Sequence, residues 1–345
     1  MSGKVVTFGE IMLRLSPPNF KRFIQTRSFD VIYGGGEANV AVSLANYGIP
    51  VDYITKLPNN EIGDACIQFL RQFGVNTKNI VRGGNRIGIY YLEMGSSIRP
   101  SKVIYDRANS AISEANSQDF NWHEIFKGVT WFHWTGITPA ISQNLANICL
   151  EAVKVAKEKE ITVSCDLNYR SKLWKYGKEP KEIMPELVKY CDVVIGNEED
   201  AEKVLGIKAP DTNVTTGKLD AANFRFVVEE IVKQYPNLKR VAITLRGSIS
   251  ASYNTWSAIL YDGNNMYIGL QYEITPIVDR VGGGDSFMGG LIYGLLTYKE
   301  DLQNALNFAV AASCLKHTIL GDFNLVSVDE VLKLMGGDTS GRVSR

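Results

Sequence analysis

The sequence predicts an α/β protein with a mainly parallel sheet, helices on both faces of that sheet, and a small separate β-sheet that forms a lid. Short apolar runs typical of buried strands alternate with longer segments whose apolar residues recur every three to four positions, as in helices. Of the 345 residues, 45% are hydrophobic and 21% are charged, which is enough for a large buried core. Only residues 86–106 interrupt the alternation, with two β-rich segments around a Gly/Ser/Pro turn.

The predicted elements follow one another in a regular order. The first four are a strand at 5–9, a helix at 37–48, a strand at 51–55 and a helix at 64–74. The next are a helix at 143–158, a strand at 161–167, a helix at 181–190, a strand at 192–196, helices at 198–205 and 218–234, and a strand at 240–244. The chain closes with helices at 285–297 and 301–316. Apolar strands that alternate with helices are typical of a Rossmann-like, mainly parallel sheet covered on both faces.

The lid is expected to combine residues 11–33 with residues 86–106, inserted into one domain that covers residues 1–335. The last stretch, 336–345, is rich in Gly and Ser and is expected to be frayed. A small exposed sheet has free edges that favour burial. We therefore expect the lid to pair with its copy in a homodimer or a higher homo-oligomer.

Composition excludes several classes of partner. Lys+Arg and Asp+Glu are both 37, and no long basic block is present, so nucleic acid is not an expected partner. The five cysteines are scattered and form no C-x-x-C pair, which favours a reducing compartment and a cytoplasmic location. Neither a signal peptide nor a membrane span is predicted. The three histidines lack metal-ligand spacing. Trp122, Trp131 and Trp134 are expected to pack in the core or at an interface, with a pocket wall as the alternative.

The segment VDRVGGGDSFMGG, residues 278–290, carries the strongest chemical signal. Three glycines, Gly282, Gly283 and Gly284, let the backbone approach an anion closely, and Asp285 follows at the start of a predicted helix. A carboxylate beside an anion hole suits phosphoryl transfer, because it can take a hydroxyl proton while the amides hold the developing negative charge. The alternative is that Asp285 is an ordinary N-cap after a turn.

A second glycine run, GGGEAN at 34–39, also lies between a strand and a helix. It lacks the third glycine of the dinucleotide fingerprint, and the chain has no G-x-x-x-x-G-K-[ST] segment. Gly34 and Gly35 either allow close approach of a ligand or form an ordinary turn. Arg170 follows a strand end, where a guanidinium suits a carboxylate or a phosphate; a surface ion pair is the alternative.

Taken together, the motifs resemble those of the ribokinase (PfkB-type) carbohydrate kinase family, and most closely its 2-keto-3-deoxygluconate kinase branch. The resemblance covers nearly the whole chain. It rests on six segments in order: TFGEIMLRLSPP, YGGGEANVAVSLANYG, IGIYYLE, CDLNYRSKLW, GNEEDA and VDRVGGGDSFMGG.

The resemblance implies roles for individual residues. Asp285 would be the general base, with Gly282, Gly283 and Gly284 as the anion hole. ATP with Mg²⁺ would bind near Asn197, Gly247 and Gly284. Asn197 and Asp200 would help to place Mg²⁺ through water. The sugar acid would contact the following residues: Gly34, Gly35, Tyr90, Tyr105, Arg107 and Arg170. Both tyrosines could instead be packing residues of the lid.

The chain departs from the family pattern at several places, including Pro58 and Ser250, each of which stands where glycine is common. Gly283 replaces a common alanine, which keeps the amides. Asp279-Arg280 stands where Asp-Thr is usual, so the monovalent-cation requirement is left open. Asp200 stands where the family has glutamate, so the magnesium role would pass to Glu199 or act through water.

The predicted function is ATP-dependent phosphorylation of a sugar acid, with 2-keto-3-deoxygluconate converted to its 6-phosphate. Two alternatives remain open: a kinase for a neutral sugar such as fructose or ribose, and a catalytically silent sugar-binding protein of the same fold. Two arginines in one pocket favour a sugar acid over a neutral sugar as the substrate. Burial of a guanidinium without a counter-charge costs free energy, and a substrate carboxylate would remove that cost.

Overall fold

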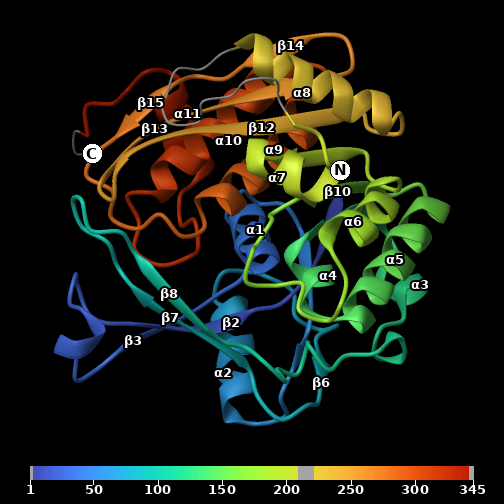
Figure 1. Ribbon diagram of the computed structural model, residues 1–345, viewed down its shortest axis with the longest axis vertical. Coiled ribbons are helices and arrows are strands. Elements are labelled where there is room, and N and C mark those ends of the chain that lie inside the picture. Colours follow the sequence, from blue (N-terminus) through green and yellow to red (C-terminus); the bar gives the residue numbers. More distant parts are fainter. Residues whose placement is uncertain (1–2, 209–220, 342–345) are drawn as a thin grey trace.

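The computed structural model describes residues 3–208 and 221–341, in which nine strands form a central sheet and four strands form a second one (Figure 1). The central order is β14-β13-β12-β11-β10-β9-β1-β4, with β15 beside β13. The strands from β12 to β4 in this order pair in parallel, whereas β13, β14 and β15 are antiparallel. The predicted α/β class and the mainly parallel sheet are confirmed.

The strands of the central sheet are β1 Lys4–Phe8, β4 Val51–Ile54, β9 Val129–Thr135, β10 Thr162–Asp166, β11 Val193–Gly196, β12 Arg240–Ser250, β13 Tyr253–Tyr261, β14 Met266–Ile268 and β15 Tyr272–Ile274. The second sheet contains β2 Met12–Ser16, β3 Asp30–Gly34, β7 Gly88–Glu93 and β8 Lys102–Asp106. A short pair joins β5 Lys56–Leu57 to β6 Val81–Arg82.

The helices are α1 Gly36–Asn46, α2 Glu61–Arg71, α3 Trp122–Ile125, α4 Ile137–Ile141, α5 Gln143–Glu158, α6 Pro180–Val188, α7 Glu198–Asp200, α8 Ala221–Gln234, α9 Gly283–Tyr298, α10 Leu302–Lys316 and α11 Val328–Met335. Two 3₁₀ turns lie at Phe23–Gln25 and Ser117–Asp119, and a π-helical turn at Ala201–Leu205 follows α7 directly.

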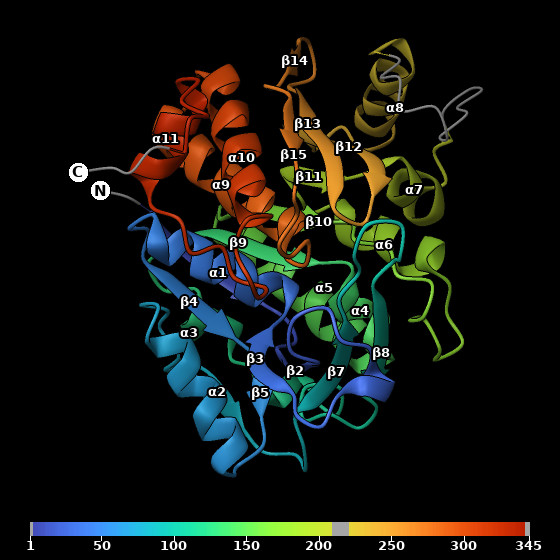
Figure 2. The ribbon, with the colours of Figure 1, turned by 90° about the vertical axis from the view of Figure 1, so that its left-hand side faces the viewer.

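Helices cover both faces of the central sheet (Figure 2). A hydrophobic core lies on each of these two faces. On β1, Val6 and Phe8 belong to the core that α3, α5, α6 and α8 cover, whereas Val5 belongs to the core under α1, α2, α9 and α10. Successive strand residues point to opposite faces, so a strand covered on both sides must be apolar throughout. This is why the parallel strands appear in the sequence as continuous apolar runs.

The second sheet is the small sheet that was predicted from residues 11–33 and 86–106, with the order β3-β2-β7-β8. Its register separates two rows of side chains. Arg14, Tyr90 and Tyr105 are paired across β2, β7 and β8, and the neighbouring row runs from Val31 through Leu15 and Tyr91 to Ile104. Because neighbouring rows alternate between faces, one face of the lid turns toward the main domain and the other toward solvent.

Several elements differ from those predicted. The aromatic run VTWFHWT is a central strand, β9, and its Trp131 and Trp134 are buried, as is Trp122 on α3. The predicted helix at 198–205 is α7 followed by the π-helical turn. Strand β12 runs beyond residue 244 into a long hairpin with β13. Residues 218–220 of a predicted helix and residues 342–345 of the predicted frayed tail lie outside the described residues.

No helix within 3–208 and 221–341 combines the length and apolar character needed to cross a bilayer. In the same ranges, no group of three or more His, Cys, Asp or Glu side chains is arranged to hold a metal ion.

Candidate active site

The glycine loop ends at the first turn of α9, and Gly282 is the residue that caps this helix. Gly282 has a φ of 83°, in the left-handed region that favours glycine. Asp285 lies inside the first turn and its side chain makes no capping bond, so the interpretation of Asp285 as an N-cap is wrong. Among the described residues, the amides of Gly284 and Asp285 donate no hydrogen bond. These amides are free to bind an anion.

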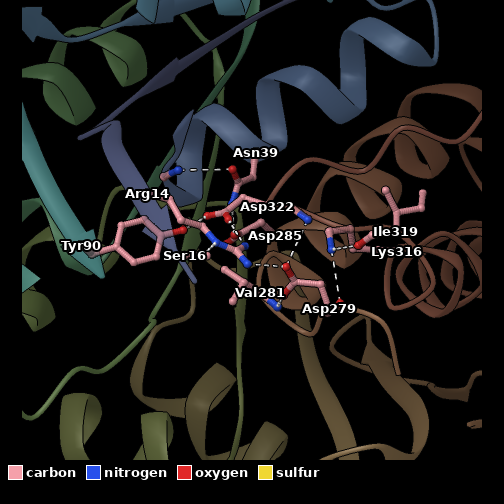
Figure 3. Close-up of polar contacts among 12 residues, drawn as sticks. Arg14, Ser16, Asn39, Tyr90, Asp279, Val281, Asp285, Lys316, Ile319 and Asp322 are labelled. Carbon is pink, nitrogen blue, oxygen red and sulfur yellow. Dashed lines mark hydrogen bonds and ion pairs between the residues drawn. The ribbon is translucent and has the colours of Figure 1, made fainter. Parts of the chain in front are cut away.

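Close helix packing brings a second helix N-terminus to Asp285. A Cβ at Gly289 would lie 2.7 Å from Cβ of Ser43 on α1, and one at Gly290 would lie 2.8 Å from Cα of Ala309 on α10. Glycine at both positions therefore lets α9 lie tightly between α1 and α10. As a result Asn39, near the start of α1, donates a hydrogen bond of 2.6 Å from Nδ2 to Oδ2 of Asp285 (Figure 3).

The surroundings of Asp285 tune its basicity. Burial raises the pKa of Asp285 to about 6, against the lowering effects of the Asn39 hydrogen bond and of the Arg170 charge. A carboxylate with this pKa is largely ionised at neutral pH and is a stronger base than an exposed aspartate. The position and the pKa together suit a general base.

This pKa leads to a test by pH. A protonated Asp285 cannot accept a proton, so kcat/KM is expected to fall as pH decreases through about 6. Asn39→Ala removes a bond that lowers the pKa, so the acid limb should move to higher pH while the plateau rate changes little. The measurement is kcat/KM against pH, with Asn46→Ala on the last turn of the same helix as the matched control. An unchanged or downward-shifted limb in Asn39→Ala would contradict the assignment.

A pocket of about 250 Å³ lies beside Asp285, between the lid and the first turn of α1. Gly36 lies between the pocket and Asp285. It lines the pocket, and a Cβ at this position would lie 3.4 Å from Oδ1 of Asp285. The charged side chains of the lining are three cations and two carboxylates: Arg107, Arg170 and Lys172, with Glu10 and Glu37. The pocket therefore has a small excess of positive charge for a ligand to neutralise.

Arg107 lines the pocket but is already paired. Its Nη2 donates to Oε2 of the buried Glu10, which also accepts a 2.6 Å bond from Ser110. The expectation of two arginines without a counter-charge is therefore wrong for Arg107, because a segment 97 residues away supplies the carboxylate. The buried Nε of Arg107 still has no acceptor among the described residues. It remains able to contact a ligand.

Arg170 has fewer partners within the protein than Arg107. Its side chain is exposed, lines the pocket and donates from Nη1 to the backbone oxygen of Tyr169 at 2.8 Å. Within the described residues it makes no ion pair. Its charge lowers the pKa of Asp285 and of Asp166.

The two tyrosines of the lid have different environments. Tyr105 lines the pocket, with the guanidinium carbon of Arg107 5.6 Å from its ring centre. Tyr90 is buried outside that lining and donates its hydroxyl to Oδ2 of Asp322 (Figure 3). Of the two predicted glycines, Gly35 lines the pocket, whereas Gly34 packs against the side chain of Asp322.

Asn197 and Asp200 form a capping box at the start of α7. Asn197 Oδ1 accepts from the amide of Asp200, and the Asp200 carboxylate accepts from the amides of Asn197 and Tyr169, at 2.8–2.9 Å. Gly247 lies on β12 opposite Thr255. Beside it is Arg246, whose pKa is lowered by burial and by the nearby charge of Arg170. A cationic face thus continues from the pocket toward β12.

Oxygen atoms that suit Mg²⁺ are present near Asp285. Both oxygens of Asp200 are engaged by backbone amides, so this residue fits an indirect role through water. Asn168 Oδ1 is buried without a donor among the described residues, and its Nδ2 bonds weakly to Asp166. Burial and the charges of Asp200 and Asp285 raise the pKa of Asp166. The donor chemistry fits a hydrated divalent cation, which would relieve this repulsion.

A comparison with known proteins decides the class of protein. The model of the pfkB family of carbohydrate kinases matches residues 2–323. The chain belongs to this family. It is therefore a carbohydrate kinase, as the six motifs predicted.

The relatives of this pfkB kinase agree with that class. A solved structure of 2-dehydro-3-deoxygluconokinase from Thermotoga maritima has 54% identity and a TM-score of 0.91, and the match covers 97% of this chain and 100% of that one. A 2-dehydro-3-deoxygalactonokinase from Haloferax volcanii is 32% identical over 99% of both chains. A putative Ribokinase II from E. coli, solved with ATP and Mg²⁺, has 20% identity and a TM-score of 0.77 over 97% of this chain and 99% of that one, which shows the fold alone.

Sequence reasoning about this kinase missed several site residues. Gly36 belongs to the same glycine run as Gly34 and Gly35, so a local signal for it exists. Glu10 and Lys172 lie within the motifs TFGEIMLRLSPP and CDLNYRSKLW, where a charged residue in the segment after a strand is a signal. Asn39 and Asp322 contact their partners across more than 200 positions, so no local pattern indicates them.

Proposed function

We propose that this kinase transfers the γ-phosphoryl group of ATP to the 6-hydroxyl of 2-keto-3-deoxygluconate. The observation that carries the proposal is the proximity of Gly36, which lines a pocket with excess positive charge, to Asp285, which lies at the free amides of α9. Support also comes from the similarity to kinases named for 2-dehydro-3-deoxy sugar acids.

In the proposed reaction, the sugar acid lies in the pocket with its carboxylate end toward Arg170 and Lys172 and its 6-hydroxyl toward Asp285. Asp285 takes the hydroxyl proton as the oxygen attacks the γ-phosphorus, and the bond to the bridging oxygen breaks to release ADP. The amides of Gly284 and Asp285 would hold the charge that spreads over the phosphoryl oxygens. Gly282 and Gly283 would shape the loop that presents them, since the amide of Gly283 already donates to the backbone oxygen of Arg280 at 3.3 Å. These contributions come from position and electrostatics.

Magnesium would arrive with the nucleotide. Mg²⁺ keeps several waters and relies on substrate phosphates, and when bound it neutralises charge on the phosphate chain. Asn197 and Asp200 would contact that water shell, and Asp166 and Asn168 supply further oxygens near Asp285. Gly247 and Arg246 on β12 would lie along the nucleotide, where the guanidinium suits a phosphate.

The proposed function is tested by ADP release with a panel of sugars. The panel contains 2-keto-3-deoxygluconate, its galactonate epimer, fructose and ribose. The expected result is turnover of at least the first sugar, with the product carrying phosphate on its terminal carbon. Preference for fructose or ribose would favour a neutral-sugar kinase, and sugar binding without ADP release would favour a silent binding protein.

We further propose that the outer face of the lid pairs with a second copy. The row Val31, Leu15, Tyr91 and Ile104 crosses the sheet on one face, and Val31 and Ile104 are 57% and 55% exposed. An exposed apolar row on a sheet is typical of an interaction surface. Light scattering should give a dimer for the wild type and a monomer for V31D/I104D. The control is Ile268→Asp, a similarly exposed position on β14, and a wild-type monomer would contradict the proposal.

A further inference from the structure

A buried cluster of charges lies directly behind the glycine loop (Figure 3). Arg14 of the lid bonds to Asp279 at 2.6 Å and to Asp322 at 2.7 Å, and it is almost completely buried. The fourth member is Lys316, the last residue of α10, which is fully buried. Two cations thus face two carboxylates, so the cluster is balanced only while Lys316 is present.

Lys316 differs from the arginine in how it is bound. Its ammonium donates to two backbone oxygens, of Asp279 at 3.3 Å and of Ile319 at 3.1 Å. Burial lowers the pKa of Lys316, whereas the charges of Asp279 and Asp322 oppose this and favour the ammonium. Carbonyl oxygens that replace water around a compact positive charge are also how proteins bind small monovalent cations.

The two oxygens belong to segments that frame the catalytic loop. Asp279 begins the stretch that leads to Gly282, and a Cβ at Gly282 would lie 3.4 Å from Cε of Lys316. Ile319 lies in the turn that follows α10 and leads to Asp322. The ammonium therefore joins the start of the loop to the segment behind it, close to the residues that carry the free amides and Asp285.

We infer that Lys316 is a positioning residue whose ammonium acts as a built-in monovalent cation and holds the Asp279–Gly282 segment in its catalytic position. This inference rests on the proposed role of the loop and of Asp285. It implies that the enzyme needs no added monovalent cation, because the chain itself fills the place between the two carbonyl oxygens.

Two variants of Lys316 and a change of buffer cation test this inference. Lys316→Ala removes the charge and leaves a cavity that an ion can enter. Lys316→Met also removes the charge, but its side chain fills that cavity. Both should lower kcat by about 100-fold, the loss that a small displacement of catalytic groups causes, while KM for the sugar changes little. Ammonium or potassium ions should restore part of the activity of Lys316→Ala and none of that of Lys316→Met. Wild-type rates should be equal in potassium and tetramethylammonium buffers.

The exposed Lys154 on α5, changed to Met, is the matched control and should behave as the wild type. A wild-type enzyme that depends on potassium, or a Lys316→Ala variant with near-wild-type kcat, would overturn the inference. Loss of folding in both variants, or a loss of activity that no cation restores, would assign Lys316 a purely structural role and also overturn it. The comparison uses whichever sugar the wild type phosphorylates, so an error in the proposed substrate leaves this test intact.

Discussion

Replacing Asp285 with Asn is expected to lower kcat by about 10²–10⁴-fold, the usual range for loss of a general base. Asparagine has the same shape but cannot accept the hydroxyl proton. The helix should be unaffected, because Gly282 rather than Asp285 caps α9. KM for the sugar and the melting temperature should therefore change little. Single-turnover kinetics together with thermal unfolding measure both effects.

A matched control separates catalysis from helix capping. Asp301 is a true N-cap aspartate, since its side chain accepts a hydrogen bond from the amide of Asn304 at the start of α10. Asp301→Asn should keep the wild-type kcat. An Asp285→Asn enzyme with near-wild-type turnover would refute the base assignment, and an Asp285→Asn protein that only unfolds would give the residue a structural role.

The second large effect concerns the choice of sugar. A substrate carboxylate can form charge-assisted hydrogen bonds with Arg170 and Lys172, each worth about 1.5–3 kcal/mol. A neutral sugar cannot form these hydrogen bonds. Since about 1.4 kcal/mol of binding free energy corresponds to a tenfold change, kcat/KM for the sugar acid should exceed that for fructose by about 10²–10⁴-fold. Arg107 contributes less to this preference than the sequence indicated, because Glu10 already neutralises it.

The variants that test this preference are Arg170→Met, Lys172→Met and Arg107→Met. Arg170→Met and Lys172→Met should lower kcat/KM for 2-keto-3-deoxygluconate and leave kcat/KM for fructose nearly unchanged. The ratio of the two kcat/KM values should therefore fall. Lys175→Met is the control, since Lys175 lies on the same loop but outside the lining of the pocket. If the wild type prefers fructose, or if the variants lose both substrates equally, the cationic side chains do not recognise a carboxylate.

The parts of the proposed catalytic centre are contiguous in the chain, so the sequence alone indicates them as candidates. Gly282, Gly283, Gly284 and Asp285 form one loop and one helical turn, so their chemistry is visible in four successive letters. The pocket proposed for the sugar is lined by only some of the residues that the sequence indicated. Tyr105, Arg107 and Arg170 line it, but Tyr90 is engaged by Asp322, and the position that faces the base is Gly36 rather than Gly34.

The sequence by itself determined the fold class, the small second sheet and the family, because strand and helix periods and glycine motifs are local properties that need no partner. The tertiary structure alone decided which charges are free. Arg14 meets Asp322 across 308 positions, and Arg107 meets Glu10 across 97. A buried cation forms an ion pair within the protein if the topology brings a distant carboxylate beside it. Without such a carboxylate, the cation is available to bind a ligand. No sequence pattern within either segment predicts which carboxylate will be the partner. The free energy of each buried charge depends on the groups that surround it in the folded structure.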